Sequence, residues 1–134
     1  LTLSDPASSA RVLVRLTGRQ MALGASGVRK GDHIVDPRTG KPSAGRRAVW
    51  VSAPRARGRE AGEPGGFRLA AGAVTDALAT AFMLMRPRDM GALCAQSPGL
   101  EAWVLPAESG RGSEAPGLLH FGSPGTAPGQ DAAG

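Results

Sequence analysis

The chain has 134 residues, 41% of them hydrophobic, a single cysteine and a formal net charge of +5. The length and the hydrophobic share support one modest core and argue for a single domain or a piece of one. The lone Cys94 excludes an internal disulfide or a metal site built from cysteines. The positive charge raises a nucleic-acid partner as an alternative. The arginines are scattered, however, and without tyrosine the chain has few aromatic side chains on which bases could stack, so we expect no nucleic-acid partner.

The first predicted elements are strands. Residues 10–16 alternate imperfectly and predict a strand with mixed faces. Residues 20–27 combine apolar side chains with Gly24, Ser26 and Gly27, which favours a short buried strand that breaks into a turn.

A turn-rich segment and a clearer strand follow. Residues 31–42 contain Asp36-Pro37 and Thr39-Gly40, dipeptides typical of tight reversals. In residues 47–53 the alternation predicts a strand with Val49 and Val51 on one face and Trp50 on the other, ended by Pro54.

Two helices are predicted next. Residues 54–68 are rich in Gly, Arg, Glu and Pro and predict an exposed loop. Residues 69–85 form the strongest helical pattern, with apolar residues at three- and four-residue spacing: Val74, Ala77, Leu78, Ala81, Phe82 and Met85. Pro87 suits the first turn of a second helix over residues 87–96, and Gly99 follows where a helix stop is expected.

The chain closes with a strand and a tail. Residues 101–105 predict a strand, whereas residues 106–134 are dominated by Gly, Pro, Ser and Ala and predict a disordered tail. Together the elements predict an α+β fold, an antiparallel sheet packed with helices, in a domain covering residues 1–105. No apolar run reaches the roughly 18 residues of a membrane span. The first six residues show no export-signal pattern, so the compartment stays open.

Two segments carry chemistry. Asp76 and Thr80 lie four residues apart, which puts a carboxylate and a hydroxyl on one helix face, and such oxygens suit Mg²⁺. The structural alternative is that Asp76 is a favourable charge near the start of the helix and that Thr80 is a small residue in a packed face. His33 is the second candidate, because a histidine beside a glycine-bearing turn can assist proton transfer. The structural alternative is that residues 36–40 form a β-turn and that His33 caps the strand before it.

Four segments in order resemble one family, the ApbE-like FAD:protein FMN transferases. Residues 31–42 resemble its H-I-I-D-P-x-T-G-x-P signature, and residues 74–85 its A-D-A-x-x-T-A-L-F-V-L helix. Residues 47–54 are similar to its V-S-V-T-V-I-A-P strand and residues 22–27 to its A-L-A-T-S-G. The resemblance spans roughly residues 4–105 and corresponds to the C-terminal half of such an enzyme, an incomplete ApbE-like, T-fold-like domain.

The resemblance implies an activity and a site. Members of the family bind FAD as substrate with Mg²⁺, break its pyrophosphate, join FMN to a threonine hydroxyl of a target protein and release AMP. Asp76 and Thr80 match the metal ligands, His33 the catalytic histidine near the flavin pyrophosphate, and Ile34 the adjacent flavin-binding position. The partners implied are FAD and a flavin-acceptor protein. Family members are often exported and membrane-anchored through an N-terminal signal.

The sequence also departs from the family pattern. Ala79 stands where some relatives carry a second Asp, Ala25 where Thr is usual, and Val28 where an aromatic residue is common. These departures, and the absence of the family's N-terminal half from these residues, keep two alternatives open. One is a catalytically inactive flavin-binding remnant, and the other is hydrolysis of FAD to FMN and AMP at the same site.

Overall fold

The computed structural model describes residues 1–18, 20–28, 31, 33–55, 70–107 and 117–122. Their fold is α+β, as predicted, with every strand pairing antiparallel. The elements in chain order are β1 (Thr2–Asp5), β2 (Ser8–Arg15), β3 (Met21–Gly27), β4 (Val35–Asp36), β5 (Lys41–Pro42), β6 (Arg46–Pro54), α1 (Ala71–Phe82), α2 (Pro87–Gln96), β7 (Glu101–Pro106) and β8 (Leu119–Phe121).

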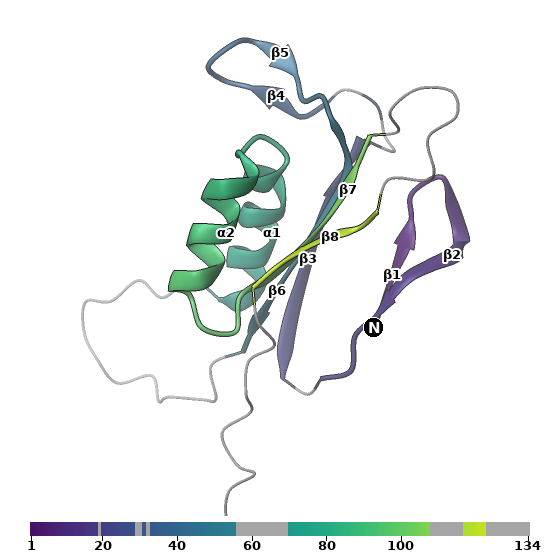
Figure 1. The fold of residues 1–134 in the computed structure, drawn as a ribbon, viewed down its shortest axis with the longest axis vertical. Helices are drawn as coiled ribbons and strands as arrows, with labels where there is room; N and C mark the ends of the chain where they lie inside the picture. Colours follow the sequence, from purple (N-terminus) through teal and green to yellow (C-terminus); the bar gives the residue numbers. More distant parts are fainter. Residues whose placement is uncertain (19, 29–30, 32, 56–69, 108–116, 123–134) are drawn as a thin grey trace, which may run out of the picture.

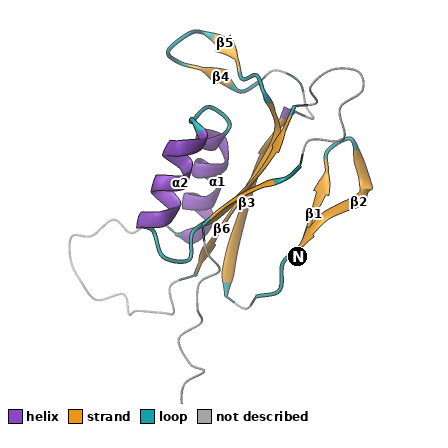
Figure 2. Ribbon diagram, viewed as in Figure 1, coloured by secondary structure: helices purple, strands orange, loops and turns teal. Residues whose placement is uncertain are grey.

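A four-stranded sheet in the order β3-β6-β7-β8 forms the centre of the described fold. Both helices lie on one face of this sheet and the β1–β2 hairpin lies on the other (Figures 1 and 2). The small β4–β5 hairpin projects beyond the turn that joins α1 to α2 (Figure 1). Neither helix has the length and apolar composition that crossing a bilayer requires.

Alternating side chains of the central strands build two hydrophobic clusters. The predicted faces of β6 are confirmed: Val49 and Val51 enter the cluster beneath the helices, and Trp50 enters the cluster beneath the β1–β2 hairpin. Trp103 of β7 pairs directly with Trp50, and Leu3 of β1 covers this second cluster. Because a strand sends successive side chains to opposite faces, one strand supplies both clusters.

The buried face of α1 differs from the predicted stripe. Thr75, Ala79 and Phe82 are buried, whereas Ala77, expected on the buried face, is exposed. The helix approaches β3 so closely that small side chains fit the contact, and a pattern based on large apolar residues misses them. The second helix has the predicted bounds, Pro87–Gln96, because proline favours the first helical turn.

The predicted tail is wrong in one place. Residues 119–121 form β8, which pairs with β7 and stacks His120 on Trp103 with ring centroids 5.0 Å apart. A three-residue strand amid glycine and proline gives no periodic signal, so its pairing with β7 determines it. The rest of the predicted tail after residue 122 lies outside the described residues, as do most of its earlier part and nearly all of the loop predicted over residues 54–68.

A buried carboxylate anchors the β1–β2 hairpin to the sheet. Asp5, only 5% exposed, accepts hydrogen bonds from the Ala7 amide at 2.9 Å and from the Arg47 guanidinium of β6 at 2.6 Å. Arg11 of β2 adds an ion pair at 3.5 Å. A buried charge requires such partners, so Asp5 ties the turn between β1 and β2 to the neighbouring strand.

Candidate functional site

The two predicted metal ligands lie on one exposed face of α1. Asp76 and Thr80 are both exposed and one helical turn apart. Asp76 is exposed, and among the described residues no hydrogen bond or ion pair uses its carboxylate. The Thr80 hydroxyl lies 3.4 Å from the Asp76 carbonyl oxygen, a long hydrogen bond within the helix.

A second hydroxyl completes this group of oxygens. Ser26 Oγ, from the end of β3, lies 2.8 Å from Thr80 Oγ1, although the two residues are 54 positions apart in the chain. The side chains of Asp76, Thr80 and Ser26 therefore present one carboxylate and two hydroxyls; we call these three residues the oxygen cluster. Sequence reasoning did not single out Ser26, because periodicity within one element does not report contacts between elements.

Gly24 permits the contact that creates the oxygen cluster. A Cβ atom at this position would lie 2.4 Å from the Thr75 carbonyl carbon and 2.6 Å from the Asp76 backbone nitrogen. No side chain fits at those distances, so β3 touches the backbone of α1 directly. The signal for this approach was the glycine itself, two residues before Ser26 in a predicted strand.

His33 and Ile34 occupy the segment after β3 and have different environments. The His33 ring is exposed, and its Nδ1 lies 2.9 Å from the Gly31 carbonyl oxygen. Since a carbonyl only accepts, Nδ1 carries the proton in this hydrogen bond, and Nε2 of the neutral ring is left as the acceptor. Ile34 is 7% exposed and belongs to the cluster beneath the helices, together with Phe82 and Met83.

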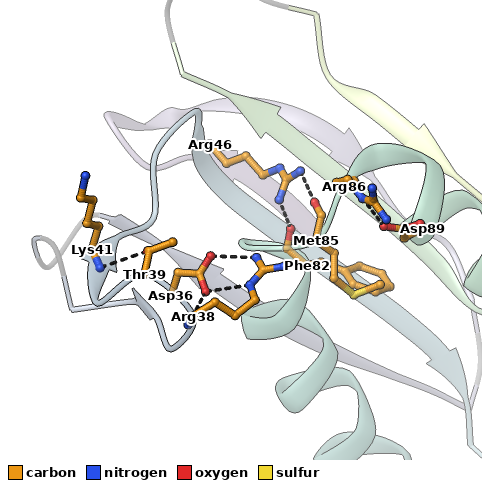
Figure 3. A network of polar contacts seen from close by, with 9 residues as sticks. All are labelled: Asp36, Arg38, Thr39, Lys41, Arg46, Phe82, Met85, Arg86 and Asp89. Atoms are coloured by element: carbon orange, nitrogen blue, oxygen red, sulfur yellow. Dashed lines mark hydrogen bonds and ion pairs between the residues drawn. The ribbon is translucent and has the colours of Figure 1, made fainter.

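The segment after Ile34 forms the tight turn that its sequence predicts. Asp36 accepts from the Arg38 amide at 2.9 Å and from its guanidinium at 2.7 and 3.0 Å (Figure 3). These hydrogen bonds from Arg38 lower the pKa of the Asp36 carboxyl. The Gly40 amide closes the turn on the Asp36 carbonyl, and Gly40 has a φ of 66°, which glycine adopts readily. The β-turn interpretation of residues 36–40 is confirmed.

Arg46 joins this region to the end of α1. Its guanidinium donates to the carbonyl oxygens of Phe82 and Met85 (Figure 3). Phe82 is the last residue of α1, and Met85 lies in the turn that joins α1 to α2. The last carbonyls of a helix lack partners within the helix and carry partial negative charge, so the hydrogen bond from Arg46 to Phe82 stabilises that end. Partial burial lowers the pKa of the guanidinium, which nevertheless stays charged at neutral pH.

Removing this guanidinium should loosen the end of α1. We expect Arg46→Met to lower the free energy of unfolding by about 2 kcal/mol, because two carbonyls lose a charged donor. Urea denaturation measures the loss, and faster amide exchange at residues 83–85 locates it. Arg88→Met is the matched control, since the Arg88 side chain is 73% exposed and its loss should change stability by less than about 0.5 kcal/mol. Equal stability of the two variants would contradict a capping role for Arg46.

A cavity of about 310 Å³ opens beside Arg46, between the Asp36 turn and the turn that joins the helices. Three charged side chains line it, and each already has a partner: Asp36 binds Arg38, Arg46 binds the end of α1, and Arg86 binds Asp89 at 2.8 Å. The charged side chains that line the cavity are therefore all engaged in contacts with other residues of the chain.

The oxygen cluster fits a hard divalent cation better than a soft one. Its donors are a carboxylate and hydroxyls, and Mg²⁺ is commonly bound through one or two carboxylates with water and substrate phosphates completing the shell. Within the described part of the chain, no three His, Cys, Asp or Glu side chains gather to hold a metal. The donor set is compatible with a metal bound together with a phosphate compound.

The described structure brings most of the singled-out segments together. Residues 22–27 contact α1 through Gly24 and Ser26, residues 47–54 pair with them in the sheet, and Ile34 packs near the end of α1. Among the described residues, however, no hydrogen bond or ion pair joins the His33 ring to Asp76 or Thr80.

Comparisons of the chain with protein-family models, with curated proteins and with solved structures found no match.

Proposed function

We propose that the chain is the C-terminal part of an ApbE-like, Mg²⁺-dependent FAD:protein FMN transferase. In the proposed reaction a threonine hydroxyl of a target protein attacks the FMN phosphorus of FAD. An Oγ–P bond forms, the pyrophosphate P–O bond breaks, AMP leaves, and the hydroxyl proton passes to a base. The target threonine then carries FMN through a phosphoester.

One observation carries the proposal. Asp76 and Thr80 lie exposed on one face of α1, and Thr80 contacts a second motif segment through Ser26. The Asp76 carboxylate has no protein partner among the described residues, and a charged oxygen ligand in that state is available to a cation. When bound, Mg²⁺ would neutralise charge that grows on the phosphate oxygens during phosphoryl transfer.

The signature segment supplies the remaining roles. The His33 ring is exposed, and the Nδ1–H hydrogen bond to Gly31 leaves Nε2 able to accept a proton from an incoming hydroxyl. In this proposal the small exposed part of the Ile34 side chain contacts the flavin, while the rest of the side chain packs in the core. The hydrogen bonds between Asp36 and Arg38 keep the turn that follows in one conformation.

A transfer assay tests the proposal. The full chain is incubated with FAD, Mg²⁺ and a threonine-containing acceptor peptide, and mass spectrometry follows the FMN–peptide adduct and AMP. We expect the adduct with the wild type and a loss of roughly 100-fold in rate for Asp76→Ala, because the cation loses its only charged protein ligand in the oxygen cluster.

The controls separate the alternatives. Asp89→Ala removes a surface carboxylate on α2 and should leave the rate unchanged. FMN and AMP without an adduct would identify hydrolysis in place of transfer. A folded wild type that consumes no FAD would show that these residues do not carry out the reaction by themselves, and would favour the inactive remnant.

A further inference from the structure

We propose that Ser26 is a positioning residue, which holds the Thr80 hydroxyl in the orientation that serves a divalent cation beside Asp76. This inference rests on the proposed function, because it assigns a residue to the same cation site. A hydrogen bond between side chains joins β3 to α1 at this point: the hydroxyl oxygens of Ser26 and Thr80 lie 2.8 Å apart.

The placement of Ser26 follows from the packing of β3 on α1. Gly24 and Ser26 are two residues apart in a strand, so they point to the same face, and their partners Val51 and Val49 both lie in the cluster beneath the helices. Two strand residues advance about 6.6 Å and four helical residues about 6 Å. With Gly24 against the Thr75–Asp76 peptide, Ser26 therefore comes opposite Thr80, one turn further along the helix.

The helix alone does not fix the Thr80 hydroxyl in one orientation. A threonine in a helix divides between two χ1 rotamers. The bond from Thr80 Oγ1 to the Asp76 carbonyl is 3.4 Å long and weak, whereas Ser26 Oγ is at normal hydrogen-bond distance. A hydroxyl has one proton and two lone pairs, so a Thr80 that gives its proton to Ser26 keeps both lone pairs for a cation. Ser26 thus selects the rotamer, with either hydroxyl as the donor of the hydrogen bond.

The test uses Mn²⁺ as the probe and the isotope-labelled full chain. Broadening of the amide signals around Asp76 and Thr80 measures Mn²⁺ affinity, and three-bond couplings measure the Thr80 χ1 population without metal. We expect Ser26→Ala to weaken Mn²⁺ binding by about threefold to tenfold, the worth of one hydrogen bond, and to release Thr80 into more than one rotamer.

Two further variants act as controls. Ser26→Thr keeps a hydroxyl at the same position and should bind Mn²⁺ within about twofold of the wild type. The double variant Ala25→Ser with Ser26→Ala moves the hydroxyl to the opposite face of β3, and it should behave like Ser26→Ala alone. Circular dichroism verifies that each variant is folded.

The outcomes distinguish this inference from the proposed function. Equal Mn²⁺ affinity of the wild type and Ser26→Ala would overturn the positioning role and leave the cation site in place. Weaker binding with an unchanged Thr80 rotamer would also overturn it, in favour of Ser26 as a direct ligand. A wild type in which Mn²⁺ leaves the Asp76 and Thr80 signals unbroadened would overturn the cation site itself.

Discussion

Gly24→Ala should destabilise the protein by about 3 kcal/mol, because a single methyl group has no room between β3 and α1. The added Cβ would lie 2.4 Å from both the carbonyl carbon and the carbonyl oxygen of Thr75. These are backbone atoms in the middle of a helix, so they cannot rotate away as the end of a flexible side chain would. The helix must move off the sheet, and the loss is a large share of the 5–15 kcal/mol typical of a domain.

The matched control for this substitution is Gly72→Ala in α1. Gly72 is exposed, and an added Cβ there meets no atom within 4 Å. Alanine is the better helix former, so this variant should gain up to about 1 kcal/mol. Urea denaturation of both variants decides the matter. A Gly24→Ala protein as stable as the wild type would show that β3 and α1 do not touch in solution, and the oxygen cluster would lose its basis.

Asp5→Ala should cost about 3 kcal/mol or more and release the β1–β2 hairpin from the sheet. The substitution leaves the Arg47 guanidinium, whose side chain is 18% exposed, without the carboxylate that it contacts at 2.6 Å. It also leaves the Ala7 amide without its acceptor in the turn between β1 and β2. Removing one member of a largely buried ion pair is expensive because the other member loses its charged partner while it stays largely out of water.

Asp89→Ala provides the comparison for Asp5→Ala. The Asp89 side chain is 39% exposed, and its ion pairs with Arg86 and Arg88 lie on the surface of α2, so its loss should change stability by less than about 1 kcal/mol. Tryptophan fluorescence reports the hairpin directly, because Trp50 and Trp103 lie in the cluster that it covers. An unshifted emission spectrum for folded Asp5→Ala would contradict the anchoring role.

The sequence was informative where one element determines its own structure. The bounds of α2 follow from Pro87 at its first turn, and the two faces of β6 follow from strict alternation around Trp50. Both features depend on local geometry and on side-chain polarity, which can be read within a window of ten residues.

Features that depend on the approach of two elements were not predicted. The buried face of α1 carries Thr75 and Ala79 because the helix touches Gly24, and a search for large apolar residues cannot recognise such a face. Strand β8 depends on pairing with β7, and no periodicity within residues 119–121 indicates it.

The candidate site shows the same division. Asp76 and Thr80 were found from their spacing on one helix, whereas Ser26 enters only through the packing of β3 against that helix. A glycine and a serine two residues apart in a strand span about the same length as an Asp and a Thr four residues apart in a helix. This match in spacing could indicate that the serine lies beside the threonine. Its meaning depends on knowing that the strand and the helix are neighbours.

Calorimetric titration of FAD into the full chain, with and without Mg²⁺, tests the central proposal most directly. We expect binding that requires Mg²⁺ in the wild type and in Asp89→Ala, and that disappears in a folded Asp76→Ala protein, because Asp76 provides the only carboxylate of the oxygen cluster. FAD binding of equal strength in Asp76→Ala and the wild type would contradict a cation site on α1.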